Sequence, residues 1–132
     1  AGFEDAKPSQ LSLGMAQRAC LARALVGHPE TLLLDEPFAS LDTFTQGHIQ
    51  EELVNLWLSE KFTAVFVTHD IDEAILLGNK IVLLAGEPAT IKDTFFIDED
   101  YPRDRNSDRF KAIRTEILKR FKHSYLAKRS LL

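Results

Sequence analysis

The sequence predicts an α/β fold, in which buried parallel strands alternate with helices. Two apolar runs, at residues 31–35 and 62–68, are continuous rather than alternating, which is typical of strands covered on both faces. Between them, Ile49, Leu53 and Leu56 recur at the spacing of a helix that buries one face. With 132 residues and 45% hydrophobic side chains, the chain suits a single domain with its own core.

The first helix is expected at residues 12–26, because Ser12 is a favourable N-cap and Gly27 with Pro29 forms a stop signal. Cys20, the only cysteine, lies within this helix. A lone cysteine cannot form an internal disulfide, so we expect Cys20 to be a small buried apolar side chain.

The other elements follow in alternating order. Asp70 and Glu73 form a capping pattern at the start of a helix, directly after the second apolar run. After the first strand we expect helix 42–59, strand 62–68, helix 71–78, strand 80–85, a β segment at 89–97, and a turn-rich linker at 98–106 that leads into a last helix.

Basic side chains gather in residues 111–132, whereas the rest of the chain is acidic. A basic tail would suit nucleic acid or an anionic membrane surface. We favour an amphipathic helix with a solvated basic face, because apolar side chains recur there at helical spacing. They are Phe110, Ile113, Ile117 and Phe121.

The first strand ends in two adjacent carboxylates, Asp35 and Glu36. Parallel sheets bind phosphates and metal ions at the carboxyl ends of their strands. On an extended segment the two side chains point to opposite sides, so Asp35 would hold Mg²⁺ through its water shell while Glu36 orients or deprotonates an attacking water. The alternative is an acidic loop that simply emerges into solvent.

Two further features suit a phosphate. Ser12 and the free N–H groups of the first helical turn, beside Gly14, form an oxyanion site at a helix N-terminus. His69, at the end of the second strand, would hydrogen-bond a phosphoryl oxygen. Taken alone, each has an ordinary structural explanation, namely a helix cap and a histidine that hydrogen-bonds within the fold.

In this order the residues resemble the ATP-binding-cassette ATPase family. The similarity to the family's signature motif, Walker B strand, D-loop and switch histidine lies at Leu11–Arg18, Leu32–Glu36, Ala39–Asp42, and Thr68–Asp70 with Glu73 and Ala74. A second and less specific similarity, at Tyr101–Arg105, is to the C-terminal end of importer ATPases for nitrate, sulfonate, taurine and related anions.

The resemblance implies ATP and Mg²⁺ as cofactors and a role for each acid. Asp35 would position Mg²⁺, Glu36 would activate the hydrolytic water, and His69 would contact the γ-phosphate. These three residues would serve ATP bound to the same subunit, and Glu36 and His69 would be the catalytic pair.

The resemblance also implies residues that act on ATP bound to the opposite subunit of a head-to-tail dimer. Ser12 and Gly14 would contact that γ-phosphate, and Asp42 would communicate across the dimer interface. Leu13 stands where the family usually has glycine, so we expect it to disfavour a positive φ and to crowd the approach of phosphate. The resemblance also places Met15 among the residues that bind the nucleotide. Met15 stands where glutamine is common, which removes a capping-box partner for Ser12.

One family motif is not in the sequence, because no Gly-x-x-x-x-Gly-Lys-Ser/Thr loop occurs in it. We expect one partial domain that is similar to the C-terminal half of a nucleotide-binding domain, with a RecA-like parallel sheet that lacks the P-loop strand. Strands 62–68 and 80–85 would flank the vacant position and close it by association or rearrangement. The expected segments are a signature-helix region at 1–30, a Walker B to switch-histidine core at 31–85, and a β segment, linker and amphipathic helix at 86–132.

The function that the resemblance implies is that of the ATP-binding and ATP-hydrolysing subunit of an importer of a small solute, with these residues inactive by themselves. A second nucleotide-binding subunit and a transmembrane permease would be its partners, at the cytoplasmic face of the cell membrane. The alternative is a non-catalytic module that dimerises or lends its signature motif to a partner ATPase. With no apolar run near eighteen residues and no leader, we expect membrane contact only through a partner, and no nucleic acid.

Overall fold

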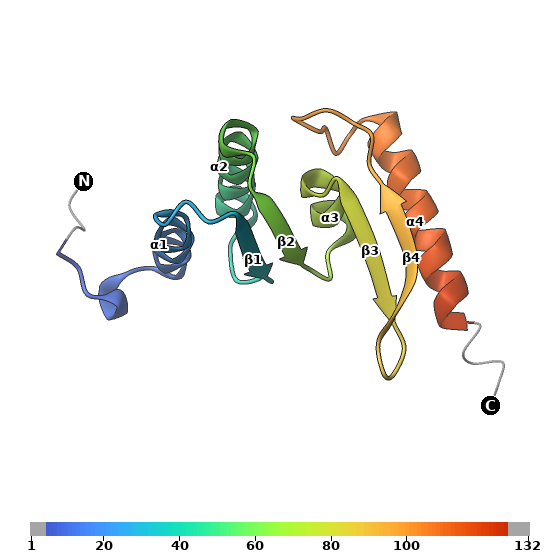
Figure 1. Cartoon of the computed structure of the whole chain (residues 1–132), viewed down its shortest axis with the longest axis horizontal. Helices are drawn as coiled ribbons and strands as arrows, with labels where there is room; N and C mark the ends of the chain where they lie inside the picture. Colours follow the sequence, from blue (N-terminus) through green and yellow to red (C-terminus); the bar gives the residue numbers. More distant parts are fainter. Residues whose placement is uncertain (1–4, 127–132) are drawn as a thin grey trace. The chain divides into compact units, whose positions relative to one another are not determined.

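The structure is a computed structural model that describes residues 5–126, so the outermost parts of the predicted end segments lie outside it. The chain forms two compact units, Ala1–Val67 and Thr68–Leu132 (Figure 1). The first contains η1 (Pro8–Gln10), α1 (Leu13–Leu25), β1 (Thr31–Asp35), α2 (Thr43–Glu60) and β2 (Thr63–Val67). The second contains α3 (Ile71–Leu77), β3 (Lys80–Ala85), β4 (Thr90–Phe96) and α4 (Asp108–Leu126).

The first unit is built on two parallel strands, β1 and β2, which α2 connects. Thr31 pairs with Thr63 and Asp35 with Val67, so the register is the same from one end of the ladder to the other. The buried apolar side chains of this unit are Leu32, Phe38, Ile49, Leu53 and Phe62. Two of them, on α2, confirm the predicted core face of that helix.

The helix α1 begins after Ser12 and ends before Gly27, as predicted. Among the described residues, however, it contributes no buried side chain. Cys20 is exposed, so the prediction that it is buried is wrong. The physical reason is the exposure of the helix, because every side chain of α1 is exposed or only half-buried.

In the second unit, β3 and β4 form an antiparallel hairpin that α4 contacts. Ile75 of α3 packs with Phe110 and Ile117 of α4 in a core cluster. The other end of that apolar stripe, Phe121, is 38% exposed. The predicted amphipathic last helix is therefore confirmed. No helix within residues 5–126 is both long and apolar enough to cross a membrane.

The strands form two separate two-stranded sheets, β1–β2 and β3–β4. The parallel pair confirms the predicted α/β class with a parallel sheet. Strands β2 and β3, which were expected to flank the vacant position of a P-loop strand, belong to different sheets in the described part of the chain. Closure of these edges by association or rearrangement stays a prediction.

A buried arginine holds the linker before α4 against the end of α3. Arg103, which is 6% exposed, donates from Nη1 to the carbonyls of Ile75 at 2.6 Å and Gly78 at 2.7 Å, and from Nε to that of Glu99 at 3.0 Å. The Tyr101 hydroxyl donates to the Leu77 carbonyl at 2.6 Å. Carbonyls of a last helical turn have no partner within the helix, and these two side chains supply the donors.

We expect Arg103→Met to lower the free energy of unfolding by about 2–4 kcal/mol, because it leaves buried carbonyls without donors. The matched control is Arg109→Met, at an exposed arginine of α4, which should stay within about 0.5 kcal/mol of the parent. Urea unfolding followed by circular dichroism compares the two, and equal losses of stability would contradict this account of Arg103.

Candidate functional site

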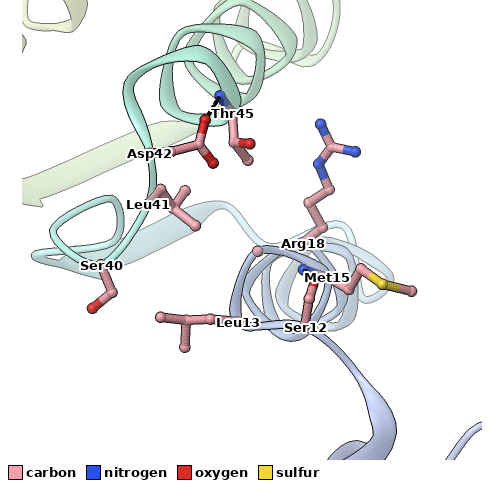
Figure 2. Close-up of a pocket in the computed structure, with 9 residues that line it drawn as sticks. Ser12, Leu13, Met15, Arg18, Ser40, Leu41, Asp42 and Thr45 are labelled. Atoms are coloured by element: carbon pink, nitrogen blue, oxygen red, sulfur yellow. Dashed lines mark hydrogen bonds between the residues drawn. The ribbon is translucent and has the colours of Figure 1, made fainter.

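Two segments of the first unit meet at a groove of about 300 Å³. One segment is the start of α1 and the other is the turn that leads into α2 (Figure 2). The lining residues are Ser12, Leu13, Gly14, Met15, Arg18, Ser40, Leu41, Asp42 and Thr45. The structure thus brings together four of the predicted site residues, namely those at positions 12, 14, 15 and 42.

The start of α1 offers unpaired backbone donors to this groove. The Ser12 hydroxyl accepts a hydrogen bond from the Met15 N–H at 3.3 Å, which confirms Ser12 as the N-cap. The other N–H groups of a first helical turn have no partner inside the helix. No acidic side chain lies in this turn, so the positive end of the helix dipole is not offset there.

The expected backbone conflict at Leu13 is not present. Leu13 is the first residue of α1, and it is absent from the described non-glycine residues with positive φ. Its side chain is 61% exposed and in Figure 2 it extends in the direction of Leu41, whereas Met15 extends away. The effect of Leu13 is therefore one of bulk at the groove rather than one of backbone strain.

Gly14 marks the close approach of α1 to the turn before α2. A Cβ atom at this position would lie 3.4 Å from Thr45 Cγ2 and 3.6 Å from Leu41 Cδ2, which is ordinary van der Waals contact. Packing within the chain therefore tolerates a methyl group at Gly14. The space that a side chain at Gly14 would occupy is part of the groove.

Asp42 caps the second helix that begins at the groove. Its Oδ1 accepts a hydrogen bond from the Thr45 N–H at 3.0 Å (Figure 2). Hydrogen bonds from the Thr45 side chain and N–H lower the pKa of the Asp42 carboxyl below its ordinary value, so it is ionised at neutral pH. The groove thus has a neutral cap on α1 and an anionic cap on α2.

The acid pair lies at the end of β1, outside the set of described residues that line the groove. Asp35 is the last strand residue and is exposed. Glu36 donates its N–H to the Val67 carbonyl at 2.9 Å but has a φ of 43°. The prediction that both carboxylates lie on an extended segment is therefore wrong, because the chain turns into the left-handed region at Glu36.

His69 belongs to the second unit, between Thr68 and the N-cap Asp70. The Asp70 carboxylate accepts hydrogen bonds from the N–H groups of Asp72 and Glu73, which confirms the predicted capping role of Asp70. The His69 side chain is exposed. Its proximity to Glu36 stays a prediction.

The chemistry of the end of β1 fits Mg²⁺ held mainly by water and phosphate. Within residues 5–126, no group of three or more His, Cys, Asp or Glu side chains could hold a metal ion. Mg²⁺ does not require such a group, because it keeps several waters and commonly takes one or two carboxylates together with substrate phosphates. Asp35 supplies one carboxylate that is open to solvent.

Sequence reasoning gave no site role to four groove residues, Arg18, Ser40, Leu41 and Thr45, of which only Thr45 lies outside the quoted motifs. Thr45 has a local signal, since it lies three residues after the N-cap Asp42 and donates its N–H to that cap. Arg18 lies one turn beyond the first turn of α1, and only helical periodicity links it to Gly14 and Met15. A search for residues on the same helical face as the signature residues would have found it.

Comparison with known proteins gives consistent results. The family model of the ABC transporter matches residues 2–39. The aliphatic sulfonates import ATP-binding protein SsuB of Bacillus thuringiensis subsp. konkukian is 47% identical over 98% of this chain and 52% of its own length. SsuB of Bacillus subtilis is 48% identical over 91% of this chain and 47% of its own length.

Archaeal and structural relatives agree. An uncharacterised ABC transporter ATP-binding protein of Methanocaldococcus jannaschii is 48% identical over 95% of this chain and 47% of its own length. The dimeric structure of MJ0796, a bacterial ABC transporter cassette, matches with a TM-score of 0.52 and 42% identity, over 58% of this chain and 32% of that one. The chain spans about half the length of its curated relatives. It belongs to the ABC transporter ATPase family.

Proposed function

We propose that this chain forms part of the ATP-binding subunit of an ABC importer, which hydrolyses ATP to drive uptake of a small solute. The observation that carries the proposal is the groove, where the start of α1 and the cap of α2 meet. Ser12 and Gly14 come from the start of α1 and Asp42 from the turn before α2, and the fold gathers them at one place. The resemblance of the sequence implies that these three residues act at ATP bound to the opposite subunit of a head-to-tail dimer.

The groove is suited to the γ-phosphate of ATP carried by a second nucleotide-binding subunit. When bound, ATP would supply the phosphoryl group, and Mg²⁺ would neutralise part of the negative charge on that group. The Ser12 hydroxyl and the free N–H groups of α1 would receive the phosphate oxygens, as helix N-termini do for anions. Arg18 would add a positive charge on the same helix. Asp42, being ionised, would lie against donors of the other subunit rather than against phosphate.

Hydrolysis would use the residues that follow β1 and β2. Asp35 would hold Mg²⁺ through water, and Glu36 would orient and deprotonate the attacking water. His69 would hydrogen-bond the γ-phosphate and stabilise charge that develops on it. The left-handed turn at Glu36 gives its carboxylate a direction that strand alternation would not provide.

The relatives support a proposal for the solute and the partners. The Bacillus relatives are named as aliphatic sulfonate importers, which favours a sulfonate such as taurine over nitrate. An ATP-binding importer subunit needs a transmembrane permease, and we place this protein at the cytoplasmic face of the membrane against it. A second nucleotide-binding subunit would complete the head-to-tail dimer, in keeping with the dimeric cassette structure.

Glu36→Gln in the full-length protein should abolish ATP turnover, because removing a general base costs about 10²–10⁴-fold in rate. ATP binding should remain, since glutamine keeps the size of the side chain. The control is Glu51→Gln, an exposed glutamate of α2, which should keep full turnover. Phosphate release and Mg²⁺-dependent ATP binding are measured on each variant. A full-length parent that binds ATP without turnover would favour the non-catalytic module.

Gly14→Ala should reduce turnover of the full-length protein about tenfold or more, because its methyl group enters the space proposed for phosphate. Folding should not suffer, since a methyl group makes only ordinary contacts there and alanine gains about 0.5–1 kcal/mol over glycine within a helix. The matched control is Gly47→Ala in α2, where a Cβ meets nothing within 4 Å. Equal turnover in the two variants would argue against a phosphate in the groove.

Disruption of the gene should prevent growth on taurine or ethanesulfonate as sole sulfur source and leave growth on sulfate unchanged. The intact gene should restore growth and the Glu36→Gln gene should not. Growth yield on each sulfur source is the measurement. A defect on nitrate as sole nitrogen source, with normal growth on sulfonates, would reassign the solute.

A further inference from the structure

The hydroxyl of Thr68 joins the residues on either side of His69. Thr68 Oγ1 donates to Glu73 Oε2 at 2.7 Å and accepts the N–H of Asp70 at 3.0 Å. A carboxylate only accepts hydrogen bonds, so the hydroxyl hydrogen must point to Glu73. The lone pairs of the oxygen are then directed to the Asp70 N–H. The peptide segment that carries His69 is thereby closed into a small hydrogen-bonded ring.

The position of Glu73, which accepts the Thr68 hydroxyl, is fixed by the packing of α3 against α4. Glu73 is 4% exposed, although it carries an ionisable side chain and lies in the first turn of α3. The next turn of α3 is anchored by Ile75, which is 0% exposed and packs against Phe110 and Ile117 of α4. Asp72 adds an ion pair to Arg114 of α4 at 2.6 Å. Movement of Glu73 would therefore require α3 to move against α4.

We propose that Glu73 is a positioning residue for His69 and acts through the hydroxyl of Thr68. The inference rests on the proposed function, because it takes His69 as the group that contacts the γ-phosphate. A group in that role must be held to within about 0.5 Å of its productive place. The His69 side chain is exposed and lies on a segment that follows a strand. The buried carboxylate adds a constraint on that segment from the adjacent helix.

The burial of a carboxylate at this position is otherwise costly. A glutamate is almost never fully buried unless it is paired, and an apolar side chain in the same place would pack without that penalty. The Glu73 carboxylate accepts the hydroxyl hydrogen of Thr68 at 2.7 Å. A side chain needed only for packing would not require a hydroxyl partner beside His69.

The test uses the full-length protein with Thr68→Val, Thr68→Ser and Glu73→Met. Valine keeps the shape of threonine but cannot hydrogen-bond, so kcat should fall about tenfold or more with KM for ATP changed less than about twofold. Serine keeps the hydroxyl and should retain most of the parent kcat. In a His69→Ala background, neither Thr68→Val nor Glu73→Met should lower kcat further, since their effect passes through His69.

The matched control is Asp72→Asn, which removes an ion pair from the same turn of α3 without touching Thr68. Hydrogen–deuterium exchange of residues 68–70 gives a readout that does not depend on turnover. Exchange should rise severalfold in Thr68→Val and Glu73→Met and stay at the parent level in Asp72→Asn. Unchanged exchange, or equal loss of kcat with and without His69, would overturn the inference. A parent protein without ATP turnover but with the expected exchange pattern would instead overturn the proposed function.

Discussion

The parallel ladder between β1 and β2 is the constraint on which the first unit depends. Asp35 lies in register with Val67, and the Glu36 N–H extends the ladder by one more hydrogen bond to the Val67 carbonyl. Both strands therefore end at the same level. The turn that follows β1 starts from this fixed level and delivers Asp42 as the cap of α2, which in turn sets one wall of the groove.

The two helix starts at the groove differ in charge, and this difference gives the groove its polarity. Neither α1 nor α2 has an acidic side chain in its first turn. The cap of α1 is the neutral hydroxyl of Ser12, whereas the cap of α2 is the ionised carboxylate of Asp42. An anion is therefore favoured at the α1 side and disfavoured at the α2 side. The capping residues set this polarity together with Arg18, a cation on the α1 side of the groove.

Sequence reasoning succeeded where the controlling interactions are local. The strands at 31–35 and 80–85 have the predicted bounds, since continuous apolar runs and turn residues delimit them. The caps Ser12 and Asp70 were predictable because a capping side chain binds the backbone only two or three residues away. The presence of Ser12, Gly14 and Asp42 in one groove agrees with the order of motifs, although no local rule places α1 beside α2.

The errors have a common origin in contacts between distant residues. Whether Cys20 is buried depends on which residues cover α1, and the sequence of the helix itself does not reveal them. The left-handed φ of Glu36 has no signal in a residue type that rarely adopts it. The carbonyls that Arg103 binds lie up to 28 residues away, so its part in ending α3 could not be read from neighbouring residues.

The exposure of Cys20 has a practical consequence. It is the single thiol in these 132 residues, and it lies on a helix that buries none of its described side chains. A maleimide dye or nitroxide spin label attached there displaces no packed neighbour. Fluorescence or electron paramagnetic resonance from that probe would follow the motion of α1 through a catalytic cycle, without any engineered cysteine in this part of the protein.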